Sequence, residues 1–191
     1  VAVRALVDGR DGAQRPGAVD AVSRQAVGRA DALTFEHEHQ DSALLERLQA
    51  EGVSVQPTAN ALLLARDKLA MRRAIDEAGL PQPVWAEVGG DAPAMAEQIG
   101  AFGDRHGWPV VLKTPRGGYD GHGVLLVDGP QDLDDGADSP AASWIAEVAA
   151  ARAGRASAGA GGGGSLGGGA VTSLLVEQAV PFTRELAVLL A

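Results

Sequence analysis

Cysteine is absent from this chain of 191 residues, so disulfide bonds and thiolate chemistry are excluded. Basic residues are also scarce. The 16 lysines and arginines are outnumbered by 25 aspartates and glutamates, and the net charge of −9 predicts no surface for nucleic acid. No apolar run is long enough to span a bilayer, and no segment has the pattern of a signal peptide. We therefore expect a cytoplasmic protein that binds neither nucleic acid nor a membrane.

The length of the chain allows one or two domains, and its hydrophobic fraction of 46% is ordinary for a globular protein. The sequence opens on Val1 instead of a methionine, and it closes within an apolar, strand-like segment at 186–191. We interpret both ends as cuts through a longer protein. The sequence does not indicate the oligomeric state, and a homodimer is one assembly that it allows.

The rest of the chain is organised around a strand, a glycine-rich loop and a second strand. Apolar residues 110–112 predict a buried strand that ends at Lys113, and residues 124–127 predict a return strand. Between them lies the glycine loop, residues 117–123, which contains four glycines. Glycines let backbone N–H groups line a concave surface for an anion, and a lysine adds a positive charge for phosphate. The stretch therefore predicts a polyphosphate site.

The glycine loop differs from the two common phosphate-binding loops. Because a strand follows it instead of a helix, it matches neither the P-loop nor the dinucleotide-binding fingerprint. A hairpin that covers phosphates, as in protein kinases, is the closer mechanical analogue. An ordinary flexible hairpin is the alternative, and Lys113 together with the motifs below favours the phosphate site.

The N-terminal part predicts a partial parallel sheet. Residues 30–35 indicate a buried strand, Asp41 or Ser42 caps the helix that follows, and residues 53–55 indicate another strand. Strand, helix and strand in this order favour a Rossmann-like arrangement. The glutamates and histidines at 36–39 have a metal-binding composition. Their side chains alternate in direction on an extended segment, however, so we interpret them as a polar loop.

The middle of the chain predicts helices and a small mixed domain. Residues 59–78 indicate a helix in two pieces, with Asp67 capping the second and Lys68 in its first turn. A cation there opposes the helix dipole, which makes Lys68 a candidate for a ligand role, although the local pattern alone favours a solvated surface lysine. Strands at 84–88 and 173–176 and helices at 92–106 and about 131–152 predict an α+β domain around the glycine loop.

A carboxylate follows the last of these strands. Glu177 ends the apolar run 173–176, and the segment from Glu177 to Val180 is suited to hydrogen bonds with an adenine amino group or ribose hydroxyls. Glu185, next to Arg184, is a further candidate for the ribose. The alternative is a strand end followed by a surface ion pair.

Four motifs in one order resemble those of the N5-carboxyaminoimidazole ribonucleotide synthetases, which are ATP-grasp enzymes of purine biosynthesis. They are Leu33-Thr-Phe-Glu-His-Glu-His39, Asp67-Lys68-Leu69, Val111-Leu-Lys-Thr-Pro-Arg-Gly-Gly-Tyr-Asp-Gly-His-Gly123 and Leu175-Val-Glu-Gln-Ala-Val-Pro-Phe-Thr-Arg-Glu185. The resemblance covers nearly the whole chain outside 153–172. The Gly-Gly-Tyr-Asp-Gly-x-Gly loop after a lysine is its most specific part.

The resemblance implies a fold of class α/β plus α+β. Residues 1–80 would form a partial Rossmann-like pre-ATP-grasp domain with a helical connection, and residues 83–178 an ATP-grasp lid subdomain. Residues 179–191 would begin a truncated C-terminal ATP-grasp domain. Within the lid, the Gly-, Ala- and Ser-rich residues 153–172 predict a flexible insert that the family does not explain.

The same resemblance implies the activity and its residues. The reaction is the ATP-dependent carboxylation of 5-aminoimidazole ribonucleotide by bicarbonate, through carboxyphosphate. Lys68 and Lys113 would contact the ATP phosphates, and Asp120 is a candidate contact of the aminoimidazole substrate. The remaining implied nucleotide contacts are Gly118, Tyr119, Asp120, Gly121, His122, Gly123 and Val124 in a mobile lid, Glu177, Gln178, Ala179 and Val180 at the adenine, and Glu185 at the ribose. Because carboxyphosphate hydrolyses readily, a glycine-hinged lid that excludes water suits this chemistry.

The chain also departs from the family pattern. The glycine-rich first turn is missing, and the Mg²⁺-binding carboxylates and bicarbonate-binding residues belong to a C-terminal part absent here, so we expect no metal ligand in this chain. Residue 68 is Lys where some members have Arg. Another ATP-grasp ligase, such as a formate-using glycinamide ribonucleotide transformylase or a biotin carboxylase, is one alternative, which the Tyr-Asp of the glycine loop disfavours. A non-catalytic nucleotide-binding fragment is another, and we expect the isolated chain to be inactive.

Overall fold

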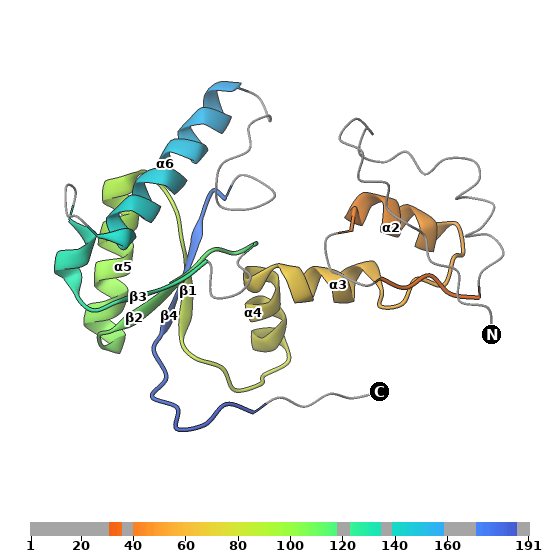
Figure 1. The fold of residues 1–191 in the computed structure, drawn as a ribbon, viewed down its shortest axis with the longest axis horizontal. Coiled ribbons are helices and arrows are strands. Elements are labelled where there is room, and N and C mark those ends of the chain that lie inside the picture. The colour runs from red at the N-terminus through yellow and green to blue at the C-terminus, as the bar shows by residue number, and fades with distance from the viewer. Residues whose placement is uncertain (1–30, 36–39, 118–122, 135–138, 159–170, 187–191) are drawn as a thin grey trace. The chain divides into compact units, whose positions relative to one another are not determined.

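A computed structural model of the chain describes residues 31–35, 40–117, 123–134, 139–158 and 171–186 (Figure 1). The chain divides into two compact units, Val1–Arg66 and Asp67–Ala191. The second piece of the predicted helix at 59–78 therefore groups with the second unit, and the domain limits drawn from the sequence stay predictions. No helix in the described ranges is both long and apolar enough to cross a membrane.

The first unit contains two helices with a small apolar core. α2 (Ser42–Ala50) begins at Asp41, whose carboxylate accepts a hydrogen bond from Leu44 N at 3.2 Å, as the sequence predicted. The chain leaves this helix at Gly52 with φ +88°, a conformation that glycine adopts without strain. α3 (Ala59–Arg66) follows. The buried members of the core are Leu45, Leu48, Val55, Ala59 and Leu62.

The predicted parallel sheet of this unit is reduced to one bridge in the described residues. Leu33 pairs with Val55 in parallel, and two backbone hydrogen bonds of 2.8 Å hold Leu33 there. The parallel direction agrees with the Rossmann-like prediction, but only Leu33 of the predicted strand 30–35 pairs. The glutamates and histidines at 36–39 lie outside the described residues.

The second unit is built on a four-stranded antiparallel sheet. Its strands are β1 (Trp85–Val88), β2 (Val110–Lys113), β3 (Val124–Val127) and β4 (Leu174–Gln178), in the spatial order β1-β4-β2-β3. Lys113 lies opposite Val124 across the β2–β3 hairpin, and Val111 lies opposite Glu177 across the β2–β4 pair. The predicted hairpin around the glycine loop is confirmed.

Two helices cover one face of this sheet. α5 (Ala92–His106) coincides with the predicted helix, and α6 (Pro140–Ala158) lies beside it after the short 3-10 helix η1 (Pro130–Leu133) (Figure 1). Successive strand residues point to opposite faces, and every second one packs against these helices. The main core residues are Val88, Val110, Leu112, Val127, Leu174 and Val176 from the sheet and Met95, Ile99, Phe102, Ile145 and Val148 from the helices. The predicted α+β domain around the glycine loop is confirmed, and its two helices lie on an antiparallel sheet.

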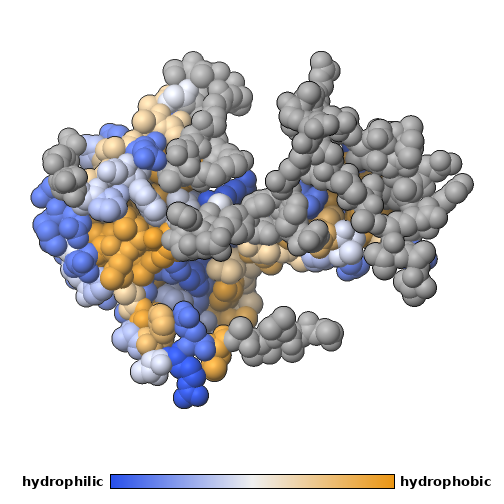
Figure 2. All heavy atoms as spheres, in the orientation of Figure 1, coloured by the Kyte–Doolittle hydropathy of each residue, from blue (hydrophilic) through white to orange (hydrophobic). Residues whose placement is uncertain are grey.

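The opposite face of the sheet carries polar contacts on one half and apolar surface on the other. α4 (Lys68–Glu77) reaches β4 there, because Arg72 contacts Glu177. On β3, Val124 and Leu126 are 45% and 55% exposed. Figure 2 shows hydrophobic surface over the β2–β3 side of the sheet. An apolar surface therefore lies beside the end of β2, where Lys113 is placed.

The predicted flexible insert begins later than its composition indicates. α6 continues through Ala158, so residues 153–158 are helical and their assignment to the insert was wrong. The physical reason is that alanine has the highest helix propensity, and extending an existing helix by a few residues costs little. Residues 159–170 lie outside the described residues, so the remainder of that prediction stays open.

Candidate functional site

The site begins where α4 meets the root of the glycine loop. Asp67 is the N-cap of α4, as predicted, and one carboxylate oxygen accepts hydrogen bonds of 3.0 Å from Leu69 N and Ala70 N. The other oxygen accepts a bond of 2.8 Å from Arg116 Nε. One aspartate therefore both starts the helix and holds the residue that precedes the glycine loop.

Lys68 adds two further contacts to the same junction. Its backbone N–H donates to Pro115 O at 2.8 Å, and its ammonium donates to Gly117 O at 2.9 Å. Thr114 N–H donates to Gly123 O at 3.0 Å, which closes the neck of the hairpin on the other side of the loop. The two ends of the glycine loop are thus fixed by backbone groups and by the first turn of α4.

Two groups at this junction have shifted pKa values. Burial raises the pKa of the Asp67 carboxyl, but hydrogen bonds from Ala70 N–H and Arg116, among others, together outweigh this effect. The pKa therefore lies below the ordinary value of 3.8. Burial lowers the pKa of the Lys68 ammonium, and the positive charge of Lys113 lowers it again. Asp67 and Glu177 only partly oppose that effect. The two ammonium groups repel one another, and a bound anion relieves such repulsion.

A buried carboxylate lies at the centre of the site. The Glu177 side chain is 5% exposed, and its two oxygens contact different cations, Lys113 Nζ from β2 and Arg72 Nη2 from α4. A buried carboxylate is costly unless it is paired and hydrogen-bonded, and two cations satisfy that need. The pairing explains why a glutamate is tolerated on β4 between otherwise buried residues.

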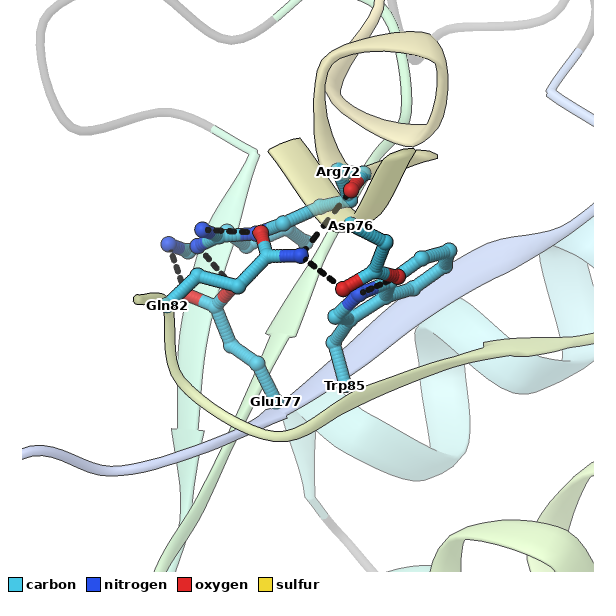
Figure 3. A network of polar contacts seen from close by, with 6 residues as sticks. Arg72, Asp76, Gln82, Trp85 and Glu177 are labelled. Carbon is cyan, nitrogen blue, oxygen red and sulfur yellow. Dashed lines mark hydrogen bonds and ion pairs between the residues drawn. The ribbon is translucent and has the colours of Figure 1, made fainter. Parts of the chain in front are cut away.

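Arg72 is held in turn by a polar network on α4 and β1 (Figure 3). Arg72 Nη1 donates to Gln82 Oε1 at 3.2 Å, and Gln82 Nε2 donates to the backbone oxygen of Arg72 at 2.9 Å. The same amide contacts Asp76 Oδ1, and Asp76 Oδ2 accepts a bond of 3.0 Å from Trp85 Nε1. The network fixes the guanidinium over the sheet.

The site has a surplus of positive charge. Arg72, Lys113 and Arg116 pair with the carboxylates of Glu177 and Asp67, while the Lys68 ammonium donates to a backbone carbonyl. These four cations exceed the two carboxylates by two charges. The whole chain carries −9, so this surplus is a local property of the site. Partly buried cations next to a glycine loop are suited to binding an anion, above all a polyphosphate.

The structure brings together part of the implied nucleotide site. Lys68, Lys113, Gly123, Val124 and Glu177 lie around the neck of the hairpin. Five implied residues, Gly118, Tyr119, Asp120, Gly121 and His122, lie outside the described residues.

The implied adenine and ribose segment leaves the sheet at the end of β4. Gln178 N–H donates to Val84 O at 2.9 Å, and Val180 O accepts a bond of 2.8 Å from Phe182 N–H. Ala179 is partly buried, whereas Glu185 is exposed. The structure does not test the nucleotide contacts of these residues, which stay predictions.

Sequence reasoning missed Arg72 and Gln82. Arg72 follows Lys68 by four residues on one helix, and that spacing places both on the same face. This signal was available in the sequence. The partner Glu177 is 105 residues away, so no local pattern linked the two. Among the described residues, no group of three or more His, Asp or Glu side chains is arranged to hold a metal ion.

Comparison with known proteins gives one family match. The model of the ATP-grasp domain matches residues 73–191. The N5-carboxyaminoimidazole ribonucleotide synthase of Mycobacterium tuberculosis H37Rv is 41% identical over 115 residues, which cover 60% of this chain and 26% of that protein. The enzyme of the same name from Synechococcus elongatus is 30% identical over 173 residues, which cover 90% of this chain and 35% of that protein. This chain therefore spans only about a quarter to a third of the length of these relatives.

Solved structures share the fold at lower identity. Carboxyaminoimidazole ribonucleotide synthase from Aspergillus clavatus, complexed with ATP, has a TM-score of 0.57 at 22% identity. The match covers 84% of this chain and 33% of the Aspergillus clavatus chain. The synthetase from Thermus thermophilus has a TM-score of 0.54 at 24% identity and covers 87% of this chain and 35% of that one. At these identities the structures establish the fold of the chain.

Proposed function

This chain belongs to the ATP-grasp family, and from that premise we propose that it forms one side of the nucleotide-binding site of an ATP-dependent carbon–nitrogen ligase. The observation that carries the proposal is the surplus of positive charge at the neck of the glycine loop. Lys68 and Lys113 converge there, and two lysines offset the charge of a polyphosphate as it shifts during phosphoryl transfer.

The substrates follow from the relatives. We propose that ATP phosphorylates bicarbonate to carboxyphosphate, with release of ADP. Carboxyphosphate then delivers its carboxyl group to the exocyclic amine of 5-aminoimidazole ribonucleotide, and phosphate leaves. The product is N5-carboxyaminoimidazole ribonucleotide, made in the cytoplasm as a step of purine biosynthesis. The relatives from Mycobacterium tuberculosis and Synechococcus elongatus are both named as synthases of this product.

The residues of this chain take three roles in the proposal. Lys68 and Lys113 bind phosphate oxygens, and the glycine loop closes over them to exclude water from carboxyphosphate. The segment that follows Glu177 leaves the sheet at the end of β4, and in the proposal it holds the adenine and ribose of ATP. Mg²⁺ accompanies ATP in such enzymes, and the described residues of this chain form no group that would hold it.

A steady-state assay of the full-length protein tests this function. Phosphate release from ATP is measured with bicarbonate and 5-aminoimidazole ribonucleotide together, and with each left out. We expect release to require both. Release that instead requires formate with glycinamide ribonucleotide, or bicarbonate with biotin, would assign the chain to another ATP-grasp ligase. ATP binding without turnover in any mixture would indicate a non-catalytic nucleotide-binding protein.

A further inference from the structure

Arg72 is more deeply buried than Lys113, the proposed phosphate ligand. Its side chain is 11% exposed, against 22% for Lys113, and it reaches Glu177 from α4 while Lys113 reaches the same carboxylate from β2. Glu177 is 5% exposed, so its charge is poorly screened by water. The two cations therefore share one buried negative charge, each through a different oxygen of Glu177.

The sheet register shows why the carboxylate lies between them. Glu177 on β4 is directly opposite Val111 on β2 and Trp85 on β1, and neither of these offers a charge. Lys113 is two residues further along β2, so its long side chain reaches Glu177 diagonally across one face of the sheet. Arg72 approaches from above that face. The carboxylate thus has one cation on each side.

The guanidinium suits this position because it is forked. Arg72 Nη2 contacts Glu177 while Nη1 donates to Gln82 at 3.2 Å, so the group is anchored at two points (Figure 3). A lysine has a single ammonium and cannot present two donors in this fixed geometry. The anchoring by Gln82 keeps Arg72 on Glu177 even when the surroundings of Lys113 change.

We propose that Arg72 is a positioning residue that neutralises Glu177 and thereby keeps the charge of Lys113 available for phosphate. This inference rests on the proposed function. With Arg72 present, the three side chains carry a net charge of +1, and Lys113 can move to an anion without leaving Glu177 unpaired. Without Arg72 the same group is neutral, and Lys113 becomes the one remaining cation on a buried carboxylate.

A charge-rescue experiment separates this role from a merely structural one. The dissociation constant of ATP is measured by calorimetry for the full-length protein, for Arg72→Met, for Glu177→Gln and for the double variant. Arg72→Met should weaken binding about tenfold, the effect of one partly buried charge. In the Glu177→Gln background the same substitution should change binding by less than about twofold, because the carboxylate that captures Lys113 is gone.

Two further variants act as controls. Arg73→Met removes the neighbouring arginine, which pairs with Glu87 in an exposed position, and should leave ATP affinity unchanged. Arg72→Lys keeps the positive charge and replaces Arg72→Met as the test variant if Arg72→Met does not fold. Its dissociation constant for ATP should stay within about threefold of the wild-type value, which is less than the loss of one charge contact. Circular dichroism of each variant verifies the fold.

The outcomes are distinguishable. Equal losses on Arg72→Met with and without Glu177→Gln would show that Arg72 acts independently of Glu177 and would overturn the inference. An Arg72→Met variant that binds ATP like wild type would overturn it too, while the proposed function stands. A wild-type protein that binds no ATP would overturn both.

Discussion

At the residue scale, Asp67 combines two roles that respond differently to substitution. It caps α4 through Leu69 N and Ala70 N and also binds Arg116 before the glycine loop. Asparagine caps a helix about as well as aspartate, but it carries no charge. Asp67→Asn should therefore keep the helix start and lose the ion pair with Arg116.

This substitution has an expected pH dependence. The pKa of Asp67 lies below 3.8 in the folded state, so the folded state binds fewer protons than the unfolded state near that pH. Its contribution to the free energy of unfolding is present above 3.8 and is lost as pH falls through the lowered pKa. Urea unfolding at about pH 7 and about pH 3 should show wild type exceeding Asp67→Asn by less at the lower pH.

A second capping aspartate supplies the control. Asp91 caps α5 by accepting a hydrogen bond of 3.0 Å from Ala94 N, and Asp91→Asn reports the loss of a capping carboxylate alone. A stability difference for Asp67→Asn that is as large at about pH 3 as at about pH 7 would contradict the assignment of a lowered pKa.

At the scale of elements, α5 is packed so closely that a glycine within it is required. A Cβ on Gly103 would lie 2.3 Å from Cε2 and 2.4 Å from Cζ2 of the Trp108 ring. The indole is held in place by a bond of 3.2 Å from its Nε1 to Asp104 Oδ1. A methyl group at this position therefore has no space unless the ring moves.

Gly103→Ala should reverse the usual effect of this substitution. In an open helix position, alanine in place of glycine stabilises by about 0.5–1 kcal/mol. At Gly103 the overpacking should instead destabilise by about 1–3 kcal/mol in urea unfolding. Gly100→Ala on the same helix is the control, because its nearest contact would be Leu133 Cδ1 at 4.0 Å. Equal stabilisation of both variants would contradict the close packing of the Trp108 ring against Gly103.

Sequence alone predicted elements where the signal was local. The hairpin around the glycine loop follows from two apolar runs and four glycines, and the two pieces of the helix at 59–78 follow from the capping aspartate. The end of α6 was missed because a Gly-, Ala- and Ser-rich segment suits a coil as well as the last turns of a helix. Composition cannot separate these two states until the preceding helix is known.

At the scale of the whole molecule, the site depends on residues far apart in sequence. The motifs predicted Lys68, Lys113 and Glu177 individually, because each lies at or near the end of an element. Their sharing of charge with Arg72 depends on α4 lying over β4, which no residue pattern within either element encodes. The sequence therefore indicated candidate residues that the structure brings together, and their roles stay predictions, but it did not indicate how their charges are balanced.

The measurement that tests the account most directly is ATP binding to the full-length protein with and without the Lys113 ammonium. Lys113→Ala removes a charge-assisted contact worth about 1.5–3 kcal/mol, so the dissociation constant from calorimetry should rise roughly 10- to 150-fold. Lys113→Arg should recover only part of this loss, because a planar fork replaces a compact charge. An ATP affinity within about twofold of wild type for Lys113→Ala, a change of about 0.4 kcal/mol, would contradict the phosphate site and leave an ordinary hairpin.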